Sequence, residues 1–274
     1  MKILIAADME GVSGVVHWDH VDSQHGEYAR FRRLMTGDVN AAIRGGYEAG
    51  ADEVIVSDGH GSGRNILVEE LDPRARLNSG SPSPLAMVQG IDSGVNAAMF
   101  VGYHARVGAQ NASLDHTWAS SAVANGWLNG RVMGEIGWNA AVCGHFDVPV
   151  ILISGDQTAC AEAAALLGPV ETAVVKQASG RMAAECLPPD AAQQRIYEAA
   201  LRAMRRLREG QAPQPLRLPQ PITVTVEWVH SEMADRAMLF PGVRRLEGKW
   251  TEFNVDDMLA AYRAFRTAVT AARG

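Results

Sequence analysis

The sequence lacks several features that mark large classes of protein. Its 274 residues include only three cysteines, Cys143, Cys160 and Cys186, and no two of them form a CxxC pair. An odd cysteine count without a secretory signal argues against a disulfide framework, so we expect three free thiols. The apolar stretch in the opening MKILIAAD is about five residues long, too short for a signal-peptide core or a membrane span. We therefore expect a cytoplasmic protein without a membrane partner.

An excess of basic residues is also missing. The chain has 25 Lys and Arg against 31 Asp and Glu, which gives a formal net charge of −6. Neutralising the phosphates of a nucleic acid requires clustered Lys and Arg in excess, so we expect no nucleic-acid partner. The glycine motifs that cradle nucleotide phosphates, GxGxxG and GxxxxGK[ST], do not occur. With 47% hydrophobic and 20% charged residues, the composition is that of a globular protein whose partner is small.

What the sequence does contain is a repeated local design, in which a short apolar run ends abruptly in polar residues. Four segments share it: ILIAADME at 3–10, EVIVSDGH at 53–60, AAMFVGYH at 97–104 and VPVILISGD at 148–156. Such runs are typical of buried parallel strands. The stretches between them, such as 36–50, are long enough for crossover helices, and 135–145 and 159–167 are predicted to be helical. The pattern predicts an α/β fold with a mostly parallel sheet flanked by helices.

The character of the chain changes towards its C-terminus. A long amphipathic helix is predicted at 190–210, followed by a proline-rich connector at 213–221 and a half-exposed strand at 222–229. Asn254 is the expected N-cap of a final helix, with Asp257 at the third position. We expect residues 1–168 to form a catalytic domain, and residues 169–274 to form a smaller C-terminal α+β segment that contributes to oligomerisation.

Acids and histidines follow directly on the predicted strands. Asp8 and Glu10 are two residues apart at the end of the first strand, so their carboxylates project to the same side. Two buried acids need a cation, and Lys2 lies at the opposite end of the strand, so a metal ion is the simpler compensator. His60 and His104 end the second and third strands and bring two imidazoles to the same edge of the sheet.

Glu135 lies in the first turn of a predicted helix. A carboxylate there is also stabilised by the helix dipole alone, and spacing does not separate that role from metal ligation. Taken together, Asp8, Glu10, His60, His104 and Glu135 supply three carboxylates and two imidazoles, the right number and kind for two divalent ions. Imidazole ligands favour zinc over magnesium. We therefore expect two Zn²⁺ per chain at the C-terminal ends of the strands.

Several ordered motifs resemble the zinc D-aminopeptidase family of the dipeptide-permease-operon type. They are DMEGVSG at 8–14, SDGHG at 57–61, GYHAR at 102–106, DHT at 115–117, GEIGWNA at 134–140, VVKQ at 174–177 and MLFPGV at 238–243. The resemblance implies that Asp8 bridges two zinc ions, that Glu10 and His60 bind one of them, and that His104 and Glu135 bind the other. It also implies that His116 is the catalytic histidine, and that the chain forms a ring-like homo-oligomer, a decamer.

The expected function is hydrolysis of the N-terminal bond of short peptides by a dinuclear zinc aminopeptidase. The preference for D-residues, D-Ala in particular, is implied by the resemblance alone, because stereochemistry depends on pocket walls that motifs do not reveal. Two alternatives stay open at this stage. The same ligand types suit a two-metal phosphoesterase, although the chain has DME where such enzymes have DxH. A non-catalytic binding module stabilised by zinc is the other.

Overall fold

The computed structural model describes residues 1–274 and contains a seven-stranded sheet in the order β3-β2-β1-β4-β7-β8-β9. Its strands are β1 (Lys2–Ala7), β2 (Glu53–Asp58), β3 (Ala75–Asn78), β4 (Ala97–Val101), β7 (Val150–Asp156), β8 (Glu171–Gly180) and β9 (Ala183–Cys186). All neighbouring strands run parallel except the last pair, β8 and β9. The predicted α/β fold with a mostly parallel sheet is confirmed, and all four predicted strands belong to this sheet.

A second sheet is antiparallel throughout and has the order β11-β12-β10-β5-β6. Its strands are β5 (Val123–Leu128), β6 (Arg131–Val132), β10 (Ile222–Trp228), β11 (Arg244–Glu247) and β12 (Trp250–Val255). Strand β10 alternates buried and half-buried residues along its whole length, as a strand with one covered face requires, and it is the strand that the sequence predicted.

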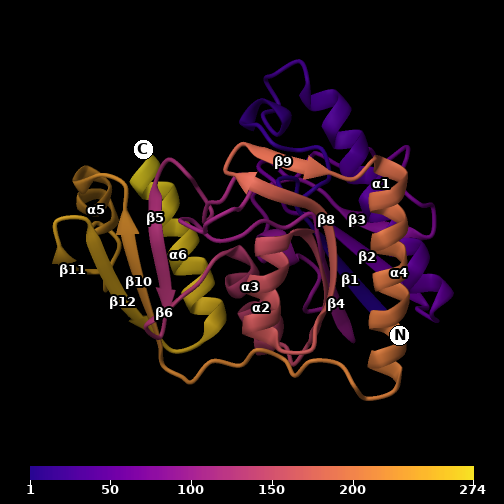
Figure 1. Cartoon of the computed structure of the whole chain (residues 1–274). Coiled ribbons are helices and arrows are strands. Elements are labelled where there is room, and N and C mark those ends of the chain that lie inside the picture. The colour runs from indigo at the N-terminus through magenta and orange to yellow at the C-terminus, as the bar shows by residue number, and fades with distance from the viewer.

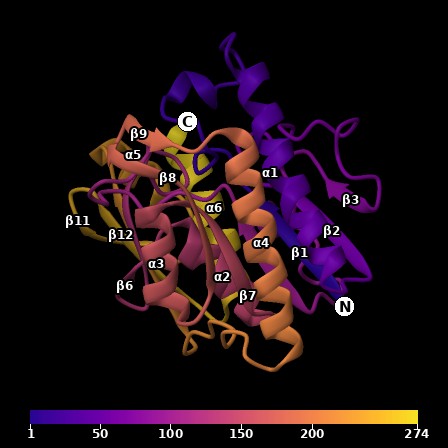
Figure 2. The same ribbon diagram turned by 45° about the vertical axis from the view of Figure 1, so that its right-hand side comes forward.

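Helices cover the large sheet on both faces and connect it to the second sheet. They are α1 (Tyr28–Glu48), α2 (Glu135–His145), α3 (Gln157–Leu167), α4 (Pro189–Arg208), α5 (Ser231–Ala237) and α6 (Met258–Arg273), with short 3₁₀ turns η1 (Trp18–His20) and η2 (Ala86–Val88). Figures 1 and 2 show α1 and α4 side by side on one face, and α2 between the large sheet and α6. The backbone of α4 runs so close to Gly45 that a Cβ there would lie 2.6 Å from the carbonyl oxygen of Tyr197.

The two sheets do not divide the chain at residue 168. Strands β5 and β6 precede that point yet pair into the second sheet, whereas β8 and β9 follow it and extend the large one. One buried cluster joins the two sheets, because it includes Trp138 of α2, Trp228 of β10 and Phe265 of α6. The C-terminal segment therefore shares a core with the residues expected to form the catalytic domain.

The expected N-cap of the last helix was wrong. Asp257 caps α6, because its Oδ1 accepts a hydrogen bond from the backbone N–H of Ala260 at 2.8 Å. Asn254 instead lies in β12, opposite Thr223 of β10, and accepts a hydrogen bond from the hydroxyl of that threonine at 2.7 Å. Pairing with β10 keeps the backbone extended through Val255 and delays the start of the helix.

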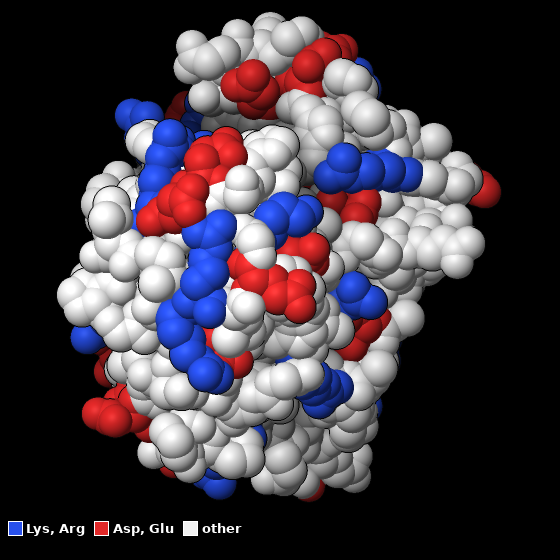
Figure 3. Space-filling model, turned by 90° about the vertical axis from the view of Figure 1, so that its left-hand side faces the viewer, with Lys and Arg blue, Asp and Glu red and all other residues white.

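The surface over α5 and β11 carries both signs of charge. Blue and red side chains lie next to one another on this face (Figure 3), where Arg244 pairs with Glu252 and Arg245 with Asp235. None of the helices combines the length and the apolar character needed to cross a lipid bilayer. All three cysteines are free thiols, as predicted from the sequence.

Candidate metal centre

The strand order places the predicted acids between the two predicted histidines. Strand β1 lies between β2 and β4, so Asp8 and Glu10 are flanked by His60, which follows β2, and His104, which follows β4. The chain passes from β1 to β2 on one side and later from β3 to β4 on the other side of β1, and such a switch point is where open α/β sheets bind ligands. The position of the candidate site therefore follows from the topology of the sheet.

Two glycines allow the loops after β1 and β4 to meet. The N–H of Gly11 donates to the carbonyl of Gly102 at 2.7 Å, and a Cβ on Gly11 would lie 2.0 Å from the carbonyl oxygen of Tyr103. Gly102 has φ +75° and lies against the carbonyl of Asp8, a conformation and a contact that a larger residue would not accept. This contact holds the Asp8–Glu10 turn against the segment that carries His104.

Glu135 and His116 come from two further elements. Glu135 is the first residue of α2, and its Oε1 accepts a hydrogen bond from the backbone N–H of Trp118 at 2.7 Å. His116 lies in a loop in which Leu114 (φ 49°) and Trp118 (φ 65°) both have left-handed backbone conformations. Backbone strain at non-glycine residues persists only where the surroundings enforce it, and it concentrates at functional sites.

The carboxylate of Asp8 faces a different histidine with each of its oxygens. Its Oδ1 lies 3.4 Å from Nδ1 of His60, and its Oδ2 lies 3.5 Å from Nε2 of His104. Glu10 approaches His60, with 3.0 Å between Oε2 and Nδ1, and Glu135 approaches His104, with 3.1 Å between Oε1 and Nε2. The five predicted ligands thus fall into two halves that share Asp8.

Each histidine has one ring nitrogen fixed by a backbone carbonyl and the other directed at the acids. Nε2 of His60 lies 3.0 Å from the carbonyl oxygen of Val21, Nδ1 of His104 lies 2.9 Å from that of Ala105, and Nδ1 of His116 lies 2.8 Å from that of Leu114. A carbonyl oxygen only accepts, so in a neutral imidazole these nitrogens carry the proton. The second nitrogen of each ring then has a free lone pair towards the carboxylates.

Burial and mutual charge shift the pKa of every member of the cluster. Burial raises the pKa of Asp8 to about 7, and the neighbouring charge of Glu10 adds to this effect. Burial would also raise the pKa of Glu10 and of Glu135, but the charges of His60 and His104 respectively outweigh it and lower both values. The acids in turn overcome the desolvation of the imidazoles, so the pKa of His60 is raised well above its usual range and that of His104 to about 10.

These shifts indicate that the negative charge of the buried acids must be balanced by positive charge. In the absence of other cations, protons on His60 and His104 provide it. Oδ2 of Asp8 and Nε2 of His104 are nevertheless buried without a hydrogen-bond partner, which is costly for polar atoms. A divalent cation would satisfy both atoms, and a set of imidazole nitrogens and carboxylate oxygens fits zinc.

His116 lies within ligand range of the same cluster. Its Nε2 is 3.5 Å from Oε1 of Glu135 and 3.8 Å from Oε1 of Glu10, and its ring stacks on that of His104 with 3.9 Å between centroids. One group whose ligand atoms are close enough to share an ion comprises His104, His116 and Glu135, and another comprises Asp8, Glu10 and His104. Burial and the charge of His104 lower the pKa of His116.

Sequence reasoning missed two basic residues that hold the site in place. The buried Lys176 of β8 donates from Nζ to the backbone carbonyls of Glu10 and Val15, both at 2.5 Å. Arg181 donates from Nε to Oδ1 of Asp115 at 2.9 Å and fixes the loop that carries His116. The motif VVKQ at 174–177 contains Lys176, but no local pattern places that side chain next to the Asp8–Glu10 turn.

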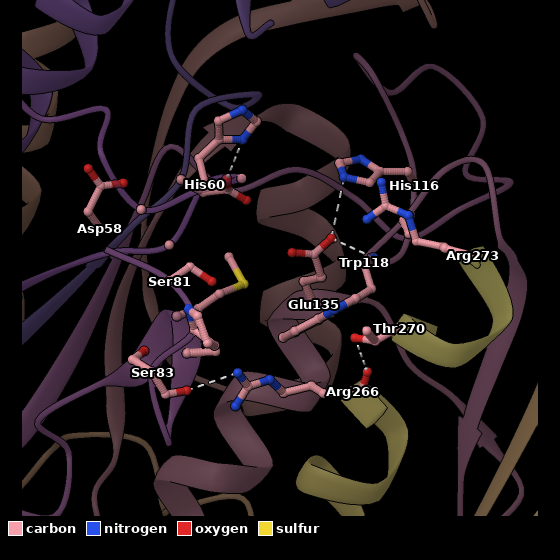
Figure 4. Close-up of a pocket in the computed structure, with 18 of the residues that line it drawn as sticks. Asp58, His60, Ser81, Ser83, His116, Trp118, Glu135, Arg266, Thr270 and Arg273 are labelled. Carbon is pink, nitrogen blue, oxygen red and sulfur yellow. Dashed lines mark hydrogen bonds and ion pairs between the residues drawn. The ribbon is translucent and has the colours of Figure 1, made fainter. Parts of the chain in front are cut away.

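Most residues of the cluster border a cavity of about 1040 Å³. Asp8, Glu10, His60, His116 and Glu135 line one part of it, and Figure 4 shows His60, His116 and Glu135 converging on a common space. Asp58 also lines the cavity, but its carboxylate accepts hydrogen bonds from the backbone N–H groups of Asn65 and Ile66 and so stabilises the loop after β2. The cavity is large enough for a ligand of several residues.

Comparison with known proteins gives consistent matches over nearly the whole chain. A family model described as D-aminopeptidase matches residues 1–267. A D-aminopeptidase of Bacillus subtilis (strain 168) is 37% identical over 265 residues, which are 96% of this chain and 95% of that protein. The solved structure of a Zn-dependent D-aminopeptidase from Bacillus subtilis, described as a self-compartmentalizing protease, superposes with a TM-score of 0.95 at 35% identity and covers 100% of this chain and 98% of that one.

Proposed function

This chain belongs to the D-aminopeptidase family and is a zinc aminopeptidase, and from that premise we propose that it removes N-terminal D-residues, D-Ala in particular, from short peptides at a centre of two zinc ions. The main support for a centre of two ions is the carboxylate of Asp8, whose two oxygens face two different histidines. The D-residue preference is supported by the names of the relatives.

We assign the ligands in two sets. Asp8 would bridge the ions, with Glu10 and His60 on one side and His104 and Glu135 on the other. When bound, zinc acidifies a water molecule and polarises the carbonyl of the scissile bond. The backbone carbonyls of Val21 and Ala105 keep both imidazoles in the tautomer that leaves a lone pair for the ion.

His116 is proposed to move the proton that hydrolysis requires. Leu114 holds its Nδ1, so Nε2 is left to take up a proton near the reacting carbonyl and to deliver it to the nitrogen of the leaving amine. A lowered pKa favours this role, because a neutral imidazole can first accept the proton and then donate it. Arg181 and Trp18 fix its position, since Trp18 contacts the His116 ring edge-on with 5.4 Å between centroids.

We also propose that the protein forms a ring-like homo-oligomer, a decamer by the family resemblance. A related protease is described as self-compartmentalizing, which requires an assembled chamber. In this chain the turn after α5 presents Leu239, whose exposed fraction is 82%, with Met238 beside it. We infer that these two neighbouring apolar side chains form part of a patch that contacts another subunit. The cytoplasmic location expected from the sequence stays a prediction.

Removing the metal should abolish activity. After treatment with a chelator and verified loss of zinc, hydrolysis of D-Ala-D-Ala should fall to background, and zinc, cobalt or manganese should restore it. L-Ala-L-Ala and an aryl phosphate serve as comparison substrates, because they separate a D-peptidase from a general peptidase and from a phosphoesterase. Full turnover by the metal-free protein would exclude the proposed function, and zinc binding without any turnover would indicate a binding module.

Zinc affinity should depend steeply on pH. The raised pKa values of His60 and His104 mean that both carry protons at neutral pH in the metal-free protein, and each ion must displace one. Between pH 6 and pH 8 we expect the dissociation constant of each ion to fall about tenfold for every unit of rising pH. Titration against a chromophoric chelator measures this dependence. An affinity that does not change with pH would contradict the assignment of these imidazoles as ligands.

A further inference from the structure

One wall of the cavity is basic, and the proposed mechanism does not use it. Every basic side chain that lines the cavity apart from the histidines comes from α6, namely Arg263, Arg266 and Arg273. Positions 263, 266, 270 and 273 recur at helical spacing, so they form one face of α6, which we call the arginine face. It extends over roughly 15 Å along the helix axis from Arg263 to Arg273.

None of the three guanidinium groups is neutralised by an acid of this chain. Arg266 donates to the carbonyl oxygens of Pro84 and Ser83, both at 2.9 Å, and those acceptors carry no charge. No hydrogen bond or ion pair involves the side chain of Arg263 or of Arg273, although most other arginines in the C-terminal segment pair with Asp or Glu. The chain has a net charge of −6, yet its main cavity contains three uncompensated cations on one wall.

Helix α6 is held firmly against the candidate site. Trp118 makes edge contacts with Tyr262 and Phe265 of α6, at 5.5 Å and 5.7 Å between ring centroids. Its backbone N–H donates a hydrogen bond to Oε1 of Glu135. The hydroxyl of Tyr262 donates to Oδ1 of Asn139 in α2 at 2.8 Å. The arginine face is therefore fixed relative to Glu135, and a ligand group bound to it would lie at a defined distance from the acids.

We infer that the arginine face binds the free C-terminal carboxylate of a short peptide, an inference that rests on the proposed aminopeptidase function. An aminopeptidase places the N-terminal residue at its reacting groups, so the opposite end of a short substrate points away from the cluster. That end is an anion, and guanidinium groups are the preferred partners of carboxylates. Figure 4 shows Arg266 reaching towards Ser83 and Arg273 on the same side of the cavity as His116, with Thr270 between them.

The dimensions of the cavity agree with this assignment. An extended chain spans at most about 3.6 Å per residue, so a peptide of two to four residues is shorter than the arginine face. A cavity of about 1040 Å³ lies at the upper end of the range for small ligands, and it is too small for a folded protein. The arginines also draw the carboxylate away from the acidic cluster, where a metal-binding carboxylate would otherwise compete with the peptide bond. By binding the C-terminal carboxylate, the arginines determine which peptide bond lies at the acidic cluster.

The decisive comparison is between a peptide acid and its amide. D-Ala-D-Ala and D-Ala-D-Ala-amide differ only in the terminal charge, and the fully metallated wild-type enzyme should have a KM for the acid at least about tenfold lower. In Arg263→Gln, Arg273→Gln and the double variant, the KM for the acid should rise, by tenfold or more in the double variant, while kcat and the KM for the amide stay near the parental values. Arg244→Gln removes an exposed arginine outside the cavity and should change nothing.

Binding of D-Ala-D-Ala and D-Ala-D-Ala-amide to the metal-free protein, measured by calorimetry, repeats the comparison without turnover. Weaker binding of the acid to the double variant, with the amide unaffected, supports the inference even if neither peptide is hydrolysed. The arginine face does not bind the carboxylate if wild type hydrolyses acid and amide with the same KM, or if the double variant loses activity towards both peptides equally at full zinc content. The proposed aminopeptidase function still stands in that case. If metallated wild type hydrolyses neither peptide, the proposed function fails, and the calorimetry alone decides on the arginine face.

Discussion

Asp8→Ala should lose both zinc ions and at least about 10³-fold in hydrolysis, the largest effect of any single change. The reason is that each oxygen of its carboxylate faces a different half of the cluster, one towards His60 and the other towards His104. Removing the shared acid weakens both sites at once. It also leaves two imidazoles with fewer acids around them, so their pKa values should fall and their charge should no longer hold Glu10 and Glu135 together.

His60→Ala is the matched comparison, because His60 contributes to one half only and its loss should empty one site first. Asp8→Asn keeps the size of the side chain and removes its charge, which separates a folding defect from a loss of ligation. Asp92→Ala changes an exposed acid far from the cluster and should retain both ions and full activity. Zinc is measured by mass spectrometry on protein whose fold has been checked by circular dichroism. An Asp8→Ala protein with close to two zinc ions per chain would show that the bridging assignment is wrong.

His116→Ala should separate chemistry from metal binding. We expect a loss of about 10²- to 10³-fold in kcat at unchanged zinc content, as is typical when a proton donor or a group that stabilises the intermediate is removed. The geometry makes this a sharp test, because Nε2 of His116 lies only 3.5 Å from Oε1 of Glu135 and is close enough to share an ion with Glu135 and His104. Rate and zinc content must therefore be measured on the same preparation.

Three results of this experiment have distinct meanings. Full metallation with a reduced rate supports His116 as the proton-transfer residue. Loss of zinc would make His116 a sixth ligand, and an unchanged rate would make it a bystander. His25→Ala, an exposed histidine in the loop before α1, is the control for removing an imidazole and should behave as wild type.

The central strands of the large sheet could be predicted from the sequence because their signals are local. A strand buried on both faces must be apolar along its whole length and must stop where it reaches solvent, so 53–60 and 97–104 stand out, as do the polar residues after them. Helix α2 was predicted with its observed ends, since Glu135 begins it after a glycine. Strands β5, β11 and β12 were missed, because they are short, partly exposed and stabilised by pairing with other strands: β5 and β12 pair with β10, and β11 pairs with β12.

The sequence by itself predicted which residues carry the chemistry: the two acids of the DME segment, the two strand-end histidines, Glu135 and, through the motif resemblance, His116. Only the tertiary structure decided how they meet. The strand order puts β1 between β2 and β4, so that Asp8 faces both histidines, and the packing of α6 against Trp118 brings arginines from the far end of the chain into the same cavity. Residue type and local spacing are properties of short segments, whereas strand order and helix docking depend on the burial of apolar surface between segments that are far apart in the chain, which no local pattern records.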